Sequence, residues 1–380
     1  KKDIISPTCL VVEDIAIASQ NLWYKQAPAW ISSVNIDFFD EGGSQIGTLS
    51  YGIQSTSSLL MAIITKNING IASYTDLIGI SWNLLVNGTN NIFFRVEDRA
   101  GNIITTSVLF MLKKDNSIPS YQLLETISQP SQDFWYKSAP YFLSSVHIRF
   151  TDEGGSQFKN ISYGIQTGNA IQLYTITDNQ NGFYSYENLI VISWDTLSNG
   201  TNNVVIRLED FAENVLTSST LFFVKKDIVL PLYEKLVTVS TEDQSRWYNS
   251  QPSWSIGMGS LFYDNSFSLL RKIDQVILTA SGIARIETVY NGIAIPTFNS
   301  SWGVSWNNLE NGVNDLYVRL EDYATNVTTT NKWFTLKKDL IAPTILNTET
   351  STFTGWFGGS ISKLNDIGVF FSDSHSHVQE

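Results

Sequence analysis

The stretch Asn87-Gly-Thr-Asn-Asn-Ile-Phe-Phe-Arg-Val-Glu-Asp-Arg-Ala-Gly-Asn102 carries the clearest structural signal in this chain. Within it, Ile92, Phe94 and Val96 occupy every second position, and a period of two with one apolar face predicts a half-buried antiparallel strand. The Asn-Gly pair at its start supplies the positive backbone angles that turns between strands need. The same stretch returns at residues 199–214 and 311–326. The strand and its turn are therefore built three times.

The triplet Lys-Lys-Asp marks the period of this repetition. It occurs at Lys1, Lys113, Lys225 and Lys337, a constant step of 112 residues, and a proline follows it in the same register each time. A unit of this length is about the size of one domain that buries its own core. We therefore expect a tandem array, beads on a string rather than a solenoid. The predicted domains are 1–115, 116–227 and 228–339, with 340–380 as the start of an incomplete fourth.

Further strands are predicted inside each repeat. Val34, Ile36 and Phe38 alternate ahead of an acidic turn, and a third apolar run extends from Ile103 to Leu112. No segment shows the periodicity of an amphipathic helix. Short strands separated by turn signals at roughly ten-residue spacing are typical of an all-β, two-sheet sandwich.

At residues 87–102 the chain resembles the bacterial Ig-like repeats of prokaryotic cell-surface proteins. In that family an Asn/Asp-Gly-Thr turn leads into the penultimate strand, which ends in Asp-x-Ala-Gly-Asn, and an Asp/Pro linker opens the next domain. The second and third copies depart from this pattern, because Asp210-Phe-Ala-Glu-Asn214 and Asp322-Tyr-Ala-Thr-Asn326 lack the glycine. The resemblance implies an Ig-like sandwich, an extracellular, cell-surface location and no catalytic residue.

Composition narrows the possible partners. A net charge of −12 disfavours nucleic acid, since binding phosphate requires a basic surface. Apolar runs such as Val108 to Leu112 are far too short to span a bilayer. One cysteine excludes a disulfide framework, and its alignment with Tyr121, Tyr233 and Ile345 predicts that Cys9 faces the core. The chain begins at a repeat boundary and stops inside a fourth unit, as expected of a segment of a longer protein.

No constellation of catalytic residues is visible, so we expect no enzyme activity in these repeats. The three histidines are His147, on the outward phase of a strand, and His375 and His377 near the end of the chain. The His-x-His pair could bind a metal ion, but the neighbouring Ser and Asp residues indicate a solvent-exposed tail instead.

The tryptophans allow two interpretations. Exposed aromatic rings stack on sugar faces, which suggests glycan binding. Alternatively, each ring fills its sandwich core or covers a sheet edge. The two repeated sets are Trp23, Trp135 and Trp247, and Trp82, Trp194 and Trp306.

Acidic residues are expected to meet at each junction between repeats. In an Ig-like topology the loop after the second strand, the loop before the last strand and the incoming linker lie at the same end of a domain. Flexible carboxylates are the ligands that Ca²⁺ prefers. The predicted interdomain calcium sets are Asp3, Asp40, Glu41 and Asp98; Asp115, Asp152, Glu153 and Asp210; and Asp227, Asp264 and Asp322.

The same carboxylates also fit two roles that involve no metal. Linker lysines such as Lys113 and Lys114 are close enough in sequence to neutralise them. Asp98 closes the core-facing phase of its strand, which suits a residue that caps its own turn. Neither role requires a cofactor.

Five glycosylation sequons are predicted to lie in turns or at strand ends. Their asparagines are Asn87, Asn160, Asn199, Asn299 and Asn326.

These observations lead to three hypotheses of function. The first is a structural surface protein that forms a surface layer, stalk or filament by self-association, since a contact made by one repeat is available again in the next. The second is a glycan-binding or adhesin module array. The third is an accessory region of a larger extracellular enzyme. The fourth unit is expected to be completed by continuation of the chain or by a strand from another chain.

Overall fold

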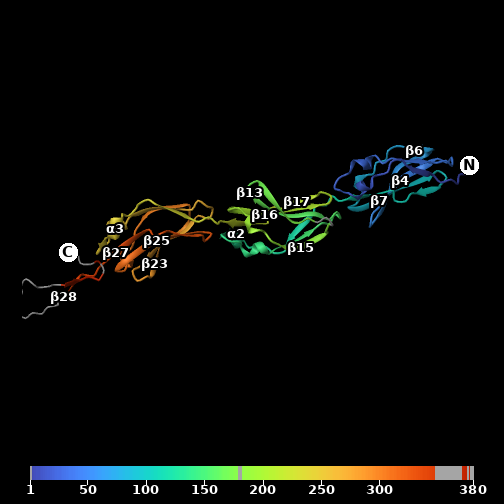
Figure 1. Cartoon of the computed structure of the whole chain (residues 1–380). Helices are drawn as coiled ribbons and strands as arrows, with labels where there is room; N and C mark the ends of the chain where they lie inside the picture. Colours follow the sequence, from blue (N-terminus) through green and yellow to red (C-terminus); the bar gives the residue numbers. More distant parts are fainter. Residues whose placement is uncertain (1, 179–181, 347–369, 375, 377–380) are drawn as a thin grey trace, which may run out of the picture. The chain divides into compact units, whose positions relative to one another are not determined.

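A computed structural model describes residues 2–178, 182–346, 370–374 and 376. Strands dominate it, and the labelled helices are single short turns (Figure 1). The predicted all-β class is therefore confirmed.

Each of the three repeats contains a three-stranded sheet and a six-stranded sheet. In the first repeat the small sheet has the order β1-β3-β6 and the large one β2-β9-β7-β4-β5, with β8 also paired to β7. Their bounds are β1 Thr8–Val11, β2 Trp23–Tyr24, β3 Ile36–Phe39, β4 Ile46–Gln54, β5 Leu59–Ile71, β6 Ser73–Tyr74, β7 Gly88–Asp98, β8 Ile103–Thr105 and β9 Phe110–Lys114.

This strand order is that of an Ig-like sandwich. The first, third and sixth strands form one sheet, as the A, B and E strands of an Ig domain do, and the remaining strands form the opposite sheet in the order G, F, C and C′. The short β2 adds in parallel to β9, whereas every other described pairing in the repeat is antiparallel. The predicted Ig-like fold is confirmed by this topology.

The second and third repeats have the same two sheets. The second contains β10 Ser120–Leu123, β11 Trp135–Tyr136, β12 Val146–Thr151, β13 Phe158–Thr167, β14 Ala170–Asp178, β15 Ser185–Ile190, β16 Gly200–Asp210, β17 Val215–Thr217 and β18 Phe222–Lys226. The third contains β19 Leu232–Lys235, β20 Trp247–Tyr248, β21 Met258–Tyr263, β22 Leu270–Leu278, β23 Ala284–Ile295, β24 Thr297–Trp302, β25 Gly312–Asp322, β26 Val327–Thr329 and β27 Phe334–Lys338.

Each repeat also has one five-residue α-helix and two single-turn 3-10 helices, which the sequence did not predict because they are shorter than any reliable helical period. The α-helices are α1 Ile17–Asn21, α2 Gln129–Asp133 and α3 Thr241–Ser245, and the 3-10 turns are Ala29–Ser32, Trp82–Leu84, Tyr141–Ser144, Trp194–Thr196, Ser253–Ser255 and Trp306–Asn308. No helix in the described part of the chain is long and apolar enough to cross a membrane.

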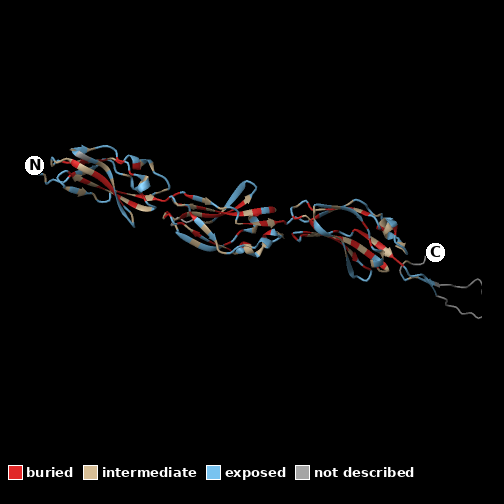
Figure 2. Cartoon of the chain, turned by 180° about the vertical axis from the view of Figure 1, so that it is seen from behind, coloured by how far each residue is buried: buried red, intermediate tan, exposed pale blue. Residues whose placement is uncertain are grey.

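The core of each sandwich is built from the alternation seen in the sequence. Ile92, Phe94 and Val96 of β7 are fully buried, and buried residues alternate with half-buried ones along this strand; Figure 2 shows buried residues in the strands of every repeat. The Phe38 ring of one sheet meets the Phe94 ring of the other with centroids 5.6 Å apart. Burying an aromatic or aliphatic side chain of this size stabilises the fold by about 1.5–3 kcal/mol. Cys9 packs against this core, as predicted.

One predicted strand is wrong in extent. The run from Ile103 to Leu112 is split into β8 and β9, and residues 106–109 between them are not in a strand. Both pieces pair with β7, at its C-terminal and N-terminal halves respectively. At the break the Thr106 amide donates to the Phe94 carbonyl, but the Phe94 amide donates to the Thr106 side chain, so a side-chain oxygen takes the place of one backbone acceptor.

The chain divides into two compact units. Unit 1 comprises Lys1–Gln132, Pro140–Leu197 and Asn202–Val224, and unit 2 comprises Asp133–Ala139, Ser198–Thr201 and Lys225–Glu380. In the fourth segment the structure describes an antiparallel pair of strands, β28 Thr344–Leu346 and β29 Phe370–Ser372.

Candidate metal centre at the repeat junctions

Three clusters of aspartates gather at corresponding places in the three repeats. In each, one carboxylate oxygen from every residue lies within 4.8 Å of the others. The clusters are Asp3, Asp40 and Asp98; Asp115, Asp152 and Asp210; and Asp227, Asp264 and Asp322. The structure thus brings together all nine aspartates that the sequence assigned to the junctions.

The topology explains why these residues meet. In the second cluster Asp152 follows β12, Asp210 ends β16, and Asp115 lies in the linker directly after β9. The three come from different elements that converge at one end of the repeat, and all lie in unit 1. Each is almost fully buried, with Asp115 and Asp210 at 0% exposure. Carboxylates are rarely buried without a charged partner, so this grouping needs a physical explanation.

Hydrogen bonds satisfy part of the second cluster. Asp115 accepts from the amides of Ser117 and Ser156, both at 2.9 Å. Asp210 accepts at 2.8 Å from both the backbone amide and the side-chain amide of Asn214. Every donor is neutral, so hydrogen bonding leaves the formal charge of three carboxylates uncompensated.

The ionisation of the clusters reflects this crowding. Burial raises the pKa of Asp210 to about 6, and the nearby charges of Asp115 and Asp152 add to the effect while Asn214 opposes it. Burial likewise raises the pKa of Asp322 to about 6. In the first cluster, burial alone would raise the pKa of Asp98, but hydrogen bonds from Asn102 lower it overall. The second and third clusters therefore carry the greater penalty for remaining charged.

Unpartnered oxygen atoms point to a further ligand in these two clusters. The hydroxyl of Ser156, next to Asp115, is buried without a hydrogen-bond partner among the described residues. In the third cluster the same holds for one carboxylate oxygen of Asp264 and for the hydroxyl of Ser268. Buried polar atoms are nearly always satisfied. Hard oxygen donors around a surplus of negative charge fit a cation such as Ca²⁺.

In the first two repeats a glycine of the acidic loop allows the linker aspartate to approach the loop backbone closely. A Cβ placed on Gly154 would lie 1.7 Å from an oxygen of Asp115, and one on Gly42 would lie 2.2 Å from an oxygen of Asp3. The third repeat has Ser266 at this position, and its hydroxyl hydrogen-bonds to both Asp227 and Asp264. The third cluster thus has a serine side chain where, in the first two, the linker carboxylate lies directly against the glycine.

Neutralisation by the linker lysines is wrong for Lys113 and Lys114. The Lys114 ammonium is buried and donates to the carbonyls of Trp82 and Leu85, at 3.2 and 2.9 Å. Lys113 donates to the carbonyl of Asn21. The capping role predicted for Asp98 is confirmed, since it accepts from the Asn102 amide at 2.8 Å. Capping and cation binding use the same carboxylate and do not exclude each other.

Several predicted site residues lie elsewhere. Glu41 and Glu153 are exposed and are not members of the clusters. Asn326 is a poor glycan acceptor, because its buried side-chain amide donates to the Asp227 carbonyl and the Asp322 carboxylate. Asn87 and Asn299 are exposed, and Asn160 and Asn199 are half-buried; glycosylation at these four stays a prediction.

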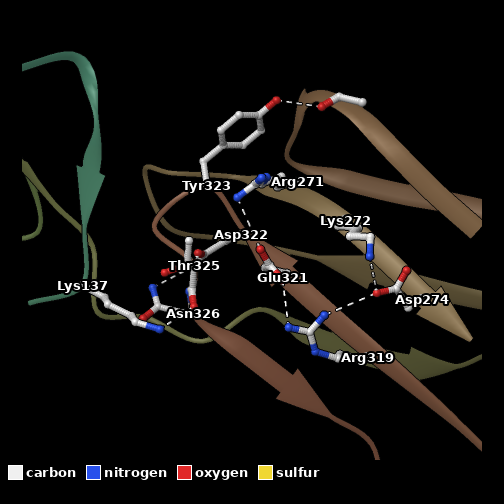
Figure 3. A network of polar contacts seen from close by, with 11 residues as sticks. Lys137, Arg271, Lys272, Asp274, Arg319, Glu321, Asp322, Tyr323, Thr325 and Asn326 are labelled. Atoms are coloured by element: carbon white, nitrogen blue, oxygen red, sulfur yellow. Dashed lines mark hydrogen bonds and ion pairs between the residues drawn. The ribbon is translucent and has the colours of Figure 1, made fainter. Parts of the chain in front are cut away.

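A lysine that bridges adjacent repeats was not predicted from the sequence. In unit 1 the Lys25 ammonium donates to the carbonyl of Glu213 at 2.8 Å. In unit 2, Lys137 makes the equivalent bond to the carbonyl of Thr325 at 2.8 Å, beside Asp322 and Asn326 (Figure 3). Glu213 and Thr325 both have positive φ, 65° and 66°, and they occupy the position where the first copy has Gly101.

Two tryptophans of the first set, Trp23 and Trp135, lie at the junctions. Trp135 stacks on Phe267, with ring centroids 6.3 Å apart and planes at 16°. The corresponding residues in unit 1, each 112 positions earlier, are Trp23 and Gly155. A Cβ on Gly155 would lie 3.3 Å from the Trp23 indole. These rings cover the acidic loop of the following repeat. Their constant spacing was the available signal, but it does not reveal what they contact.

Trp82 and Trp306 support the core interpretation. Both rings are half-buried and pack against the core of their repeat. A lysine ammonium lies over each ring, 4.9 Å for Lys114 over Trp82 and 5.0 Å for Lys338 over Trp306. A face occupied by a cation is closed to a sugar.

The one histidine in the described part of the chain, His147, is not a member of the aspartate clusters. His147 is on the outward phase of its strand, as predicted, and its ring nitrogen lies 3.1 Å from Glu187. His375 and His377 lie outside the described residues.

Comparison with known proteins identifies no family for this chain. No family model matches the chain, and no curated protein does. Among solved structures, it is similar to a tetra-tandem repeat from the extending region of a large adhesion protein (15% identity, 85% of this chain and 74% of that one, TM-score 0.32). It is also similar to a Ca²⁺-stabilised ice-binding adhesin of an Antarctic bacterium (14%, 90% and 77%, 0.31) and to cadherin repeats 3–6 of protocadherin gammaB7 (13%, 91% and 77%, 0.32). Such identities and TM-scores identify neither a family nor a ligand.

Proposed function

We propose that this chain is a non-enzymatic structural segment of an extracellular, cell-surface protein, in which each 112-residue repeat is a domain and each junction holds a divalent cation, with Ca²⁺ the best fit. The observation that carries the proposal is the buried Asp115, Asp152 and Asp210 cluster with its unpartnered Ser156 hydroxyl. A divalent cation there would offset two of the three buried negative charges while contacting all three carboxylates.

Such a cation would join two repeats rather than one. The backbone amide of Asp115 donates to the carbonyl of Tyr24 in the first repeat, and its carboxylate accepts from Ser156 in the second. Asp227 repeats both contacts in unit 2, with Tyr136 and Ser268. A ligand bound by these aspartates therefore fixes the linker to the loop that follows it. This is the expected design of a segment that spaces or stiffens a surface structure, such as a layer, stalk or filament.

Calorimetry of the chain with and without Ca²⁺ tests the metal part of the proposal. A ligand at one hundred times its Kd stabilises the protein that binds it by about 2.7 kcal/mol, so saturating Ca²⁺ should raise the melting temperature of the repeats. Asp210→Asn should remove the gain for one junction. Asp195→Asn, at an exposed position of the same repeat, serves as the matched control. If Ca²⁺ raises the melting temperature equally in both variants, the cation does not bind at Asp210.

Labelling of intact source cells tests the location. An antibody raised against residues 1–340 is expected to bind cells that have not been permeabilised. Signal that appears only after lysis would rule out a surface role. We also propose that the chain self-associates, because each surface contact is available three times.

A further inference from the structure

The large sheet of each repeat ends in a long edge strand, with no further strand paired to it among the described residues. β5, β14 and β23 close these sheets on one side and run for 13, 9 and 12 residues. On the opposite side the edges are the two-residue strands β2, β11 and β20. A long edge presents backbone donors and acceptors to any strand of matching register unless proline, charge or a covering segment prevents it.

These edges have little of that protection. Neither β5 nor β14 contains proline, and their single charged residues are Lys66 and Asp178. Instead, apolar side chains stand on the solvent face of the edge. In β5 these are Leu59, Met61 and Ile63, which are 63%, 39% and 63% exposed.

The second repeat continues this row, and the third has a residue of this kind. In β14, Ile171 and Leu173 are 41% and 44% exposed, and in β23 Ile286 is 63% exposed. An isolated exposed apolar side chain is ordinary, but a row of them on a free strand edge is typical of an association surface.

One position is shared by all three edges. Met61 pairs with Gly52, Leu173 with Gly164 and Ile286 with Val276, and these partners are 112 residues apart in sequence. Met61, Leu173 and Ile286 therefore lie at equivalent points of the three sheets, although Ile286 is one residue further along the chain than the 112-residue period predicts. We take this position as the centre of an antiparallel pairing, in which the residue lies opposite the same residue of a second chain.

Self-pairing about this centre is chemically consistent in every repeat. Around Met61, Leu59 would face Ile63. Around Leu173, the flanking Gln172 would face Tyr174, with no charge on either side.

In the third repeat, Arg285 would face Glu287 on both sides of the centre at Ile286. Directly opposed residues of unlike charge stabilise an antiparallel pair, and like charges destabilise it. An identical strand supplies this complementarity reciprocally.

We propose that β5, β14 and β23 are the surface by which this chain self-associates, each edge pairing antiparallel with the same edge of a second copy. The inference rests on the self-association included in the proposed function and names its surface. A second copy is the occupant because the centred register sets Leu59 against Ile63 in the first repeat, gives a match without charge in the second, and sets Arg285 against Glu287 in the third. Three such edges on one chain multiply a weak contact into avidity.

Sedimentation velocity over a wide concentration range tests the proposal. The triple variant Met61→Lys, Leu173→Lys and Ile286→Lys puts like charges at the centre of every edge. Its matched control is Leu189→Lys, on β15 at the edge of the small sheet, where the native side chain is 53% exposed. Circular dichroism confirms that each variant remains folded. The wild type and the control should associate with similar Kd. The Kd of the triple variant should be at least about tenfold higher.

A cross-linking measurement gives a second, position-specific result. Leu173→Cys in a Cys9→Ala background should form a disulfide between copies, because directly opposed residues in antiparallel strands lie within bridging distance. Leu189→Cys should not. Association that survives in the triple variant and cross-links equally through both cysteines would overturn the edge assignment while leaving self-association intact. A wild type that stays monomeric at all concentrations would remove self-association itself.

Discussion

Asn214→Ala should cost the second repeat a large part of its stability. The buried side-chain amide donates to the Asp210 carboxylate at 2.8 Å and to the Asp115 carbonyl at 3.0 Å. A hydrogen bond to a charged group contributes about 1.5–3 kcal/mol and a neutral one about 1 kcal/mol. Removing both should therefore destabilise the repeat by about 3 kcal/mol and leave the linker carbonyl unpaired.

Scanning calorimetry of the 380-residue chain at pH 7 measures this loss. In a domain of this size, 1 kcal/mol corresponds to roughly 4 °C, so one transition should move down by about 10 °C while the others stay in place. Asn116→Ala is the control, because Asn116 is an exposed residue of the same linker, and exposed substitutions stay within about 0.5 kcal/mol. If Asn214→Ala shifts the transition no further than Asn116→Ala, the linker is not held to the second repeat by this amide.

Three further predictions concern the same junctions. Because burial raises the pKa of Asp322 to about 6 from its ordinary 3.8, its protonated form stabilises the fold fully below about pH 4 and loses this contribution as the pH rises through 6; in chelator, the melting temperature of the third repeat should fall over that window, and Asp322→Asn should flatten the fall. Thr325→Gly should raise the same transition by a few degrees, since it relieves a positive φ worth about 1–2 kcal/mol and keeps the carbonyl that binds Lys137; an unchanged or lower transition would argue against strain. Chelation should shorten the maximum dimension in small-angle scattering without changing circular dichroism, and an unchanged dimension would contradict cation control of the junctions.

Much of the fold was accessible from sequence because the information is local. The alternation through Ile92, Phe94 and Val96 fixes a strand and its buried face, and a repeated period fixes how often it occurs. Knowledge of Ig-like loop order then sufficed to predict that Asp115, Asp152 and Asp210 meet. The prediction of one continuous strand from Ile103 to Leu112 was wrong. There the Thr106 side chain takes a hydrogen bond from the Phe94 amide in place of a backbone carbonyl.

The remaining junction contacts depend on distances that sequence does not contain. Lys137 and Thr325 are 188 residues apart, and nothing in either neighbourhood marks the other. The same is true of Trp135 and Phe267, whose stacking requires the loop of one repeat to reach the edge of another. The charge state of the clusters was equally out of reach, because burial and hydrogen bonding, rather than residue type, decide it.

Isothermal titration of the chelator-treated chain with Ca²⁺ at pH 7 shows whether the junction aspartates bind a cation. Extracellular Ca²⁺ modules bind with a Kd of about 0.1–1 mM, so saturable heat is expected in the millimolar range. Asp210→Asn and Asp322→Asn should each remove one site, and Asp195→Asn should remove none. Saturable binding that is lost site by site is the predicted result. An absence of binding up to about ten times that concentration, or binding unaffected by the two cluster variants, would contradict the assignment of the junction aspartates as cation sites.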